Sequence, residues 1–128
     1  MDDHDFVAAF EACTLPSSEF THRSHVRLAW LYLRDRSLLE ALPHFSSGLK
    51  RYAASLGATG KYHETITWAY LFLIHERMQR STAATFDEFA ATNDDLFTEI
   101  LTRYYSPALL DSALARTAFV MPDVRSTR

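Results

Sequence analysis

Two histidines, His22 and His25, lie three positions apart in the segment FTHRSHVRLAW, which covers residues 20–30. On a helical wheel of about 100° per residue, both imidazoles fall on the same face as Val26 and Ala29. The two histidines therefore stand at the start of an apolar stripe. Because such a stripe normally packs against a core, we expect both rings to point inward at one end of a helix bundle.

A third histidine, His63, occupies the equivalent place in a later segment. In KYHETITWAYLFLI, residues 61–74, it starts a stripe that includes Ile66 and Tyr70. Short loops join the predicted helices between the two segments, so helices that follow each other in the chain should pack antiparallel. The helices that begin near His22 and His63 would then run parallel, with their N-terminal ends side by side. We therefore expect the three imidazoles to converge.

Three converging imidazoles are a plausible ligand set for a metal ion. His22, His25 and His63 could hold a divalent transition metal (Zn, Fe, Cu or Ni) and leave coordination positions open for water or substrate. The positive end of a helix dipole disfavours imidazolium, and neutral imidazole is the form that binds metal. The alternative is a polar cluster in which each ring is hydrogen-bonded to a carbonyl, to Tyr62 or to Glu64.

Further polar residues near this end of the bundle are candidate catalytic groups. Glu64 projects about 100° away from His63 around the helix, so we expect it to orient a ligand imidazole or to take a proton from bound water. Its alternative role is that of an acid in the first turn, favoured there by the helix dipole. Tyr62 and Tyr105 supply hydroxyl groups and complete the candidate catalytic set. The sequence leaves open whether the site is also lined by Lys61, Arg103 and Tyr104.

The pattern of the whole chain predicts an all-α fold. Glycine occurs only 3 times, and no alternating run rich in valine or isoleucine lies between hairpin turn signals. We expect a compact single-domain bundle of about five to six helices. The longest should cover about residues 3–13, 22–34, 38–56 and 62–80, with shorter helical segments after Thr85, after Asn93 and after Ser106.

Length and composition predict one domain. With 128 residues, 48% of them hydrophobic, the chain can bury a core without a disulfide or a structural metal. The domain should cover residues 1–128, with an irregular C-terminal tail at 119–128, where the pattern FVMPDVRSTR has no helical period.

Charge and cysteine content bear on partners and compartment. The formal net charge is -3 and there is no basic run, which argues against nucleic acid and anionic membrane as partners. The start MDDHDFVAAF is acidic where a signal peptide is basic and then apolar, and the one cysteine, Cys13, cannot form an internal disulfide. The apolar run ITWAYLFLI is about half of the roughly 20 residues that span a bilayer. We expect a cytoplasmic protein.

Four segments taken together resemble a known group. FTHRSHVRLAWLYL, GKYHETIT, YYSPALL and ARTAFVMPD are similar to stretches of a group of short bacterial all-helical proteins with no assigned activity. The resemblance covers nearly the whole chain. It implies that the four segments belong together, and it implies no substrate, cofactor or catalytic role.

The leading functional hypothesis is a metal-dependent enzyme that acts on a small-molecule substrate. The ion would polarise the substrate or activate water, and Glu64 would move the proton; the ligands suit a hydrolase, a lyase, an isomerase or an oxygenase. One alternative is a metal-independent isomerase or lyase that uses His63 and Glu64 as acid and base. Another is a non-catalytic helical binding or partner protein. The sequence also leaves a homodimer open.

Overall fold

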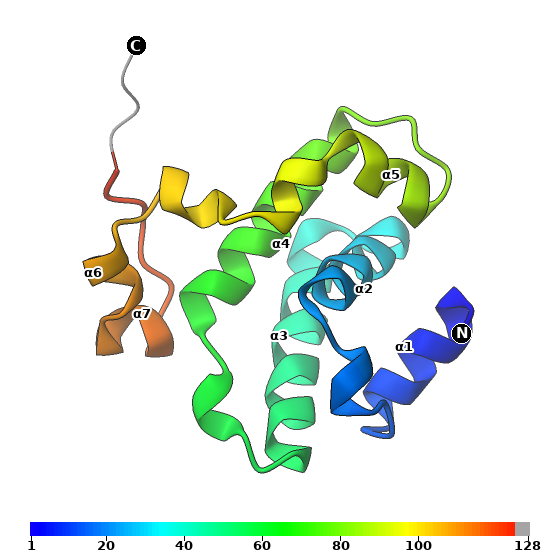
Figure 1. The fold of residues 1–128 in the computed structure, drawn as a ribbon, viewed down its shortest axis with the longest axis horizontal. Coiled ribbons are helices and arrows are strands. Elements are labelled where there is room, and N and C mark those ends of the chain that lie inside the picture. The colour runs from blue at the N-terminus through cyan, green and yellow to red at the C-terminus, as the bar shows by residue number, and fades with distance from the viewer. Residues whose placement is uncertain (125–128) are drawn as a thin grey trace.

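The structure is a computed structural model that describes residues 1–124, and it is helical throughout, with no β-strand in that range. The all-α prediction is confirmed, although the described residues form seven α-helices instead of five or six (Figure 1). Four short 3₁₀ helices lie between them: η1 (Ser17–Glu19), η2 (Thr59–Lys61), η3 (Asp94–Phe97) and η4 (Ile100–Arg103). The α-helices are α1 (Asp3–Glu11), α2 (His22–Asp35), α3 (Leu38–Ser55), α4 (Glu64–Gln79), α5 (Phe86–Thr92), α6 (Pro107–Leu110) and α7 (Ala113–Thr117).

Side-chain caps fix where the main helices begin. The Thr21 hydroxyl accepts a hydrogen bond from the backbone N–H of Ser24 at 3.3 Å, which starts α2. Ser37 does the same for Glu40 at α3, and the Glu40 carboxylate accepts the Ser37 N–H in return. Each cap satisfies backbone donors that have no partner within the first turn. These two starts agree with the sequence prediction.

The segment 94–103 departs from the single helix expected after Asn93. It forms two 3₁₀ helices, η3 (Asp94–Phe97) and η4 (Ile100–Arg103), separated by an extended backbone at Thr98. The Thr98 hydroxyl donates to the carbonyl oxygen of Asp95 at 2.8 Å. A hydroxyl that bonds a nearby carbonyl offers the backbone an alternative to the α-helical pattern, and here that alternative is the one observed.

Helices α2, α3 and α4 form the centre of the bundle, and each packs against the other two. In Figure 1, α2 and α4 run in the same general direction and α3 runs in the opposite direction, with α1 beside α3 and α5 beside α2. Helices α6 and α7 lie beside α4, on the side away from α1. The order agrees with the antiparallel packing predicted from the short loops.

Helix α1 approaches α3 closely at a glycine. A Cβ atom at Gly48 would lie 2.9 Å from the Phe10 ring, so a larger residue there would displace that ring. Phe10 is almost fully buried and stacks on Phe20, with 5.4 Å between the ring centroids. The contact between α1 and α3 therefore supports Phe20, which belongs to the wall of the cavity described below.

After α7 the chain is irregular over residues 118–124, in agreement with the tail expected from residue 119; the rest of that predicted tail, 125–128, lies outside the described residues. Thr65 of α4 holds this segment: its hydroxyl donates to the carbonyl of Ala118 at 2.8 Å and accepts the Val120 N–H at 3.1 Å. The tail is thereby fastened to the start of α4.

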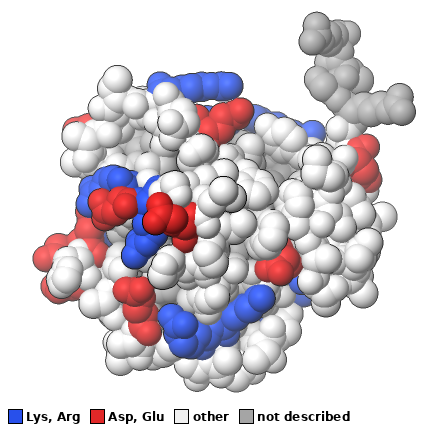
Figure 2. Space-filling model, turned by 180° about the vertical axis from the view of Figure 1, so that it is seen from behind, with Lys and Arg blue, Asp and Glu red and all other residues white. Residues whose placement is uncertain are grey.

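Basic and acidic side chains are interspersed on the face shown in Figure 2, without an extended patch of one sign. Within residues 1–124, no helix has both the length and the apolar character needed to cross a membrane.

Candidate functional site

A cavity of about 590 Å³ lies where the N-terminal ends of α2 and α4 face the C-terminal half of α3. Its aromatic walls are Phe20, Phe45, Tyr52, Tyr62 and Tyr70. Aliphatic side chains also line it, among them Val26, Leu49, Leu56, Ile66 and Ile74. The polar residues that reach it are Ser17, His22, His25, Lys61, His63 and Thr67.

All three histidines singled out in the sequence line this one cavity. The three residues therefore border one cavity at the same end of the bundle. Their ring nitrogens, however, have different bonding partners, and these partners decide which chemistry each ring can perform.

His63 is a structural clasp. It precedes α4, and its Nδ1 accepts the backbone N–H of Ile66 at 3.1 Å. Its Nε2 lies 2.7 Å from the carbonyl oxygen of Leu110, and because a carbonyl only accepts, Nε2 carries the proton. The ring is thus neutral, 7% exposed, and bonded through both nitrogens. His63 has no free nitrogen for a metal or for proton transfer, so the base role considered for it from the sequence is not supported.

His22 is fixed by a carbonyl far along the chain. Its Nε2 donates to the carbonyl oxygen of Leu96 at 2.9 Å. The ring packs edge-on against Tyr70, with 5.1 Å between centroids, and also against Phe97. Its Nδ1 makes no hydrogen bond within residues 1–124.

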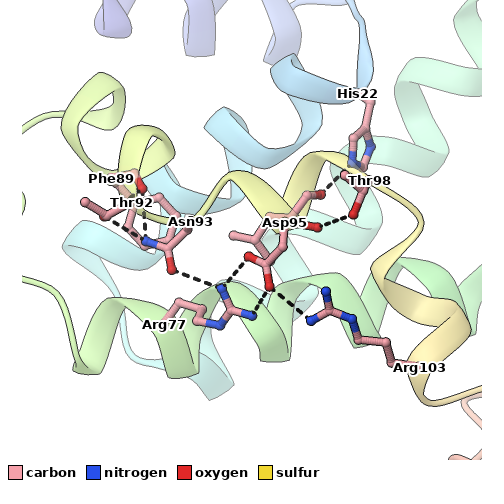
Figure 3. A network of polar contacts seen from close by, with 9 residues as sticks. His22, Arg77, Phe89, Thr92, Asn93, Asp95, Thr98 and Arg103 are labelled. Atoms are coloured by element: carbon pink, nitrogen blue, oxygen red, sulfur yellow. Dashed lines mark hydrogen bonds and ion pairs between the residues drawn. The ribbon is translucent and has the colours of Figure 1, made fainter.

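The turn that presents the Leu96 carbonyl is held by an ion-pair network (Figure 3). Asp95 lies between two guanidinium groups: Arg77 binds both of its carboxylate oxygens at 2.8 Å, and Arg103 binds one at 3.1 Å. Arg77 also donates to the Asn93 side chain at 3.1 Å. The hydrogen bonds and charge of Arg77 lower the pKa of Asp95 to about 2. Arg103 is thus part of this support and does not line the cavity.

His25 differs from the other two histidines. Its Nδ1 lies 3.0 Å from the carbonyl oxygen of Thr21, so Nδ1 carries the proton. The same carbonyl accepts the His25 backbone N–H at 3.1 Å, and the ring packs on Phe20 with 4.1 Å between centroids. Nε2 makes no hydrogen bond within residues 1–124, yet every fully buried side-chain nitrogen or oxygen atom there has a partner. Nε2 is therefore accessible.

The protonation state of His25 follows from its surroundings. Burial lowers the pKa of the imidazole, the nearby His22 lowers it further, and the hydrogen bond to Thr21 opposes the change. The ring is therefore neutral at neutral pH. Its Nε2 presents an unused lone pair at a largely apolar cavity.

The predicted three-histidine metal centre is not formed in this structure. No group of three or more His, Cys, Asp or Glu side chains in the described part of the chain is placed to hold a metal ion. The physical reason is that backbone groups occupy the ring nitrogens: both of His63 and one each of His22 and His25. Hydrogen bonding to carbonyls, the alternative left open by the sequence, describes all three rings.

Glu64 also has a structural role. Its Oε1 accepts the Tyr62 hydroxyl at 2.6 Å and the Trp68 indole N–H at 3.0 Å, and Lys50 Nζ lies 4.0 Å from Oε2. Burial and the Glu64 carboxylate raise the pKa of Tyr62, so its hydroxyl stays protonated. Glu64 lies outside the lining of the cavity, behind Tyr62. The expected proton-shuttling role of Glu64 is not supported by these contacts.

Tyr105 is part of a second, smaller core with Ala69 and Leu101. Its hydroxyl donates to the carbonyl of Val120 at 2.8 Å, and the residue is 2% exposed. It does not line the cavity, so its predicted place beside the histidines is not supported; Tyr104 likewise packs against the cores.

Sequence reasoning missed the Thr21 carbonyl as the partner that sets the His25 tautomer. A usable signal was present, because Thr21 is the N-cap and His25 lies four residues later, directly over that carbonyl.

Comparison of the chain with protein-family models, with curated proteins and with solved structures gives no match. The volume and mostly apolar walls of the cavity, with a few polar groups, are typical of sites for small molecules.

Proposed function

We propose that the protein binds a small molecule in this cavity and catalyses proton transfer on it without a metal, with His25 as the general base. The observation that carries the proposal is the hydrogen bond from His25 Nδ1 to the Thr21 carbonyl, 3.0 Å long, which leaves Nε2 as the accessible acceptor. The isomerase or lyase class suggested by the sequence is retained, and the base moves from His63 to His25.

The surroundings of His25 suit a base. A base must be unprotonated in the resting protein, and burial provides this by lowering the pKa of the ring. The Thr21 carbonyl fixes the tautomer and can stabilise the imidazolium that forms when Nε2 takes a proton. Packing against Phe20 holds the plane of the ring, so the lone pair keeps one direction.

The simplest reaction needs no second reactant. His25 Nε2 takes a proton from a substrate carbon that lies between a carbonyl group and a C=C double bond, and the C–H electron pair is delocalised through a dienolate onto the carbonyl oxygen. The imidazolium then returns the proton to the far carbon of that double bond, and the double bond moves into conjugation with the carbonyl group. The substrate is isomerised, no atoms are gained or lost, and His25 ends neutral. Burial favours this return because it destabilises the charged ring.

A metal-dependent form of the same site has one supporting observation. His22 Nδ1 and His25 Nε2 make no hydrogen bonds within residues 1–124, and both residues line the cavity. A Zn, Fe, Cu or Ni ion held by these two nitrogens would take its remaining ligands from water or substrate.

Proton exchange in deuterated water tests the proposal. We would incubate untagged protein with a panel of cyclic and aromatic ketones and follow loss of their C–H signals by NMR. Wild-type protein should accelerate the exchange of at least one compound, and His25→Gln should lose about a hundredfold or more of that rate. The matched control is His44→Gln, because His44 is exposed and does not line the cavity.

The same experiment separates the alternatives. Equal rates for wild type and His25→Gln would refute the base. A rate abolished by a chelator and restored by one transition metal would favour the metal-dependent form. Binding of the ketones without exchange would favour a non-catalytic binding protein.

A further inference from the structure

The charges that reach the cavity are unbalanced. Of the residues among 1–124 that line it, Lys61 is the only formally charged one, three others are histidines, and none is Asp or Glu. The nearest acid along the chain, Glu64, faces away: its carboxylate bonds Tyr62 and Trp68 and lies beside Lys50. No carboxylate in the described lining can therefore neutralise a cationic ligand.

Lys61 is free to meet a ligand. It is exposed at the end of the 3₁₀ helix η2 (Thr59–Lys61), and its ammonium makes no ion pair or hydrogen bond with any residue among 1–124. The neighbouring Lys50, in contrast, lies 5.1 Å from the centroid of the Tyr62 ring and 4.0 Å from Glu64.

A second cation fixes the segment that carries Lys61. Arg116 of α7 donates to the carbonyl oxygen of Gly60 at 3.0 Å. This bond ties η2 to the C-terminal helices and adds positive charge beside the rim of the cavity. Lys61 and Arg116 therefore place two positive charges at or beside the rim of the cavity.

Two of the three tyrosines in the wall, Tyr52 and Tyr62, use their hydroxyls in bonds to other residues and present ring faces to the cavity. Tyr52 donates its hydroxyl to the Leu15 carbonyl at 2.7 Å, and Tyr62 donates to Glu64 at 2.6 Å. Recognition by these residues is then by contact with the aromatic surface. A flat apolar body suits such walls, since aromatic rings stack or meet edge to face.

From these observations we infer the substrate class: a small acid with a flat, apolar body and one carboxylate, the body lying among the rings and the carboxylate held by Lys61 at the rim. The inference rests on the proposed use of this cavity as a small-molecule site. Lys61 acts as a single positive charge, and its exposure means that salt weakens the attraction.

Three ligands with one ring system test the charge preference. Cinnamate, cinnamamide and cinnamylamine share the same flat body and carry an anionic, a neutral and a cationic head. Titration calorimetry at low salt should rank cinnamate first and the amine last, with cinnamate bound about tenfold tighter than the amide, as expected for a charge-assisted contact. Raising the salt concentration should narrow that difference.

Variants assign the preference to one residue. Lys61→Met should bring cinnamate to the affinity of cinnamamide and leave cinnamamide unchanged, which also shows that the cavity is intact. Lys61→Arg should keep the preference for the anion. The control is Lys50→Met, because Lys50 lies outside the cavity lining and should not affect the ranking.

The inference is overturned if the amide or the amine binds as tightly as cinnamate, if none of the three binds, or if Lys61→Met keeps the preference. These outcomes are distinct from failure of the proposed proton transfer. Preference for cinnamate without exchange of any ketone would refute His25 as a base and leave the ligand class standing. Exchange that depends on His25, without preference for the anion, would support His25 as a base and refute the ligand class.

Discussion

The Nδ1 atom of His63 lies 3.1 Å from the backbone nitrogen of Ile66, so an imidazole caps α4 in the place where a hydroxyl or carboxylate usually does. The other ring nitrogen holds the Leu110 carbonyl at the end of α6. One ring thus joins the start of a central helix to a C-terminal helix. This relationship explains an inward histidine without any role in chemistry.

His63→Ala should lower the free energy of unfolding by about 2 to 3 kcal/mol, because it removes a cap and a buried hydrogen bond. His63→Asn should recover part of this loss, since asparagine caps well but is too short to reach Leu110. Urea denaturation gives both values. The control His44→Ala should stay within about 0.5 kcal/mol of wild type. If His63→Ala is as stable as wild type, the bonds of His63 to Ile66 and Leu110 do not stabilise the fold, which would contradict the structural role assigned to His63.

Glu64→Ala should cost about 1 to 3 kcal/mol, because the Tyr62 hydroxyl and the Trp68 indole N–H lose their shared acceptor. Glu64→Gln keeps an acceptor oxygen and should cost less. The Gln variant also removes the negative charge, so the pKa of Tyr62 should fall towards its ordinary value, as measured by tyrosinate absorbance during alkaline titration. An unchanged titration would show that Glu64 does not contact Tyr62 in solution.

The ion pair between Arg77 and Asp95 should make the free energy of unfolding depend on pH in the acid range. Asp95 has a pKa of about 2, below its ordinary value of 3.8, so the folded protein resists protonation there. Asp95 therefore contributes to the free energy of unfolding above pH 3.8, and this contribution is lost as the pH falls towards about 2. Asp95→Asn should remove this part of the pH dependence in urea denaturation, whereas Asp94→Asn, next to it and exposed, should retain it.

His25 should affect stability in a different pH window. Burial lowers its pKa below 6.5, so the unfolded chain takes up a proton that the folded protein refuses. The contribution of the neutral His25 ring to the free energy of unfolding is therefore present above pH 6.5 and is lost as the pH falls through the pKa of the folded protein. As the pH falls below 6.5, the free energy of unfolding of wild type should therefore decrease relative to that of His25→Gln. A difference independent of pH would mean that the ring is not buried as observed.

Much of the fold follows from local sequence signals. The cap residues Thr21, Ser37 and Ser106 predict where α2, α3 and α6 begin, and the short loops predict the antiparallel order of the main helices. That order in turn predicts that the three histidines lie at the same end of the bundle, where all three line one cavity. The two 3₁₀ helices of segment 94–103 were not predictable in this way, because they depend on a local hydroxyl bond and on Arg77, which is distant in sequence from Asp95.

The chemistry of the site was harder to predict than its place. His22 bonds a carbonyl 74 positions away and His63 one 47 positions away, and no local pattern indicates such partners. Metal ligation and hydrogen bonding to carbonyls require the same inward histidines, so residue type and spacing do not separate them. Only the His25 partner, four residues earlier at the N-cap of the same helix, lay within reach of sequence reasoning.

Long-range proton–nitrogen correlation spectra of the histidine rings test the central claim most directly, because they report which nitrogen of each ring carries the proton. At neutral pH the account predicts opposite tautomers: His25 protonated on Nδ1 with a free Nε2, and His63 protonated on Nε2 with Nδ1 as acceptor. Adding Zn²⁺ should leave the His63 signals unchanged. A His25 ring that is protonated on Nε2, or Zn²⁺ shifts shared by all three rings, would contradict the account and restore the metal centre.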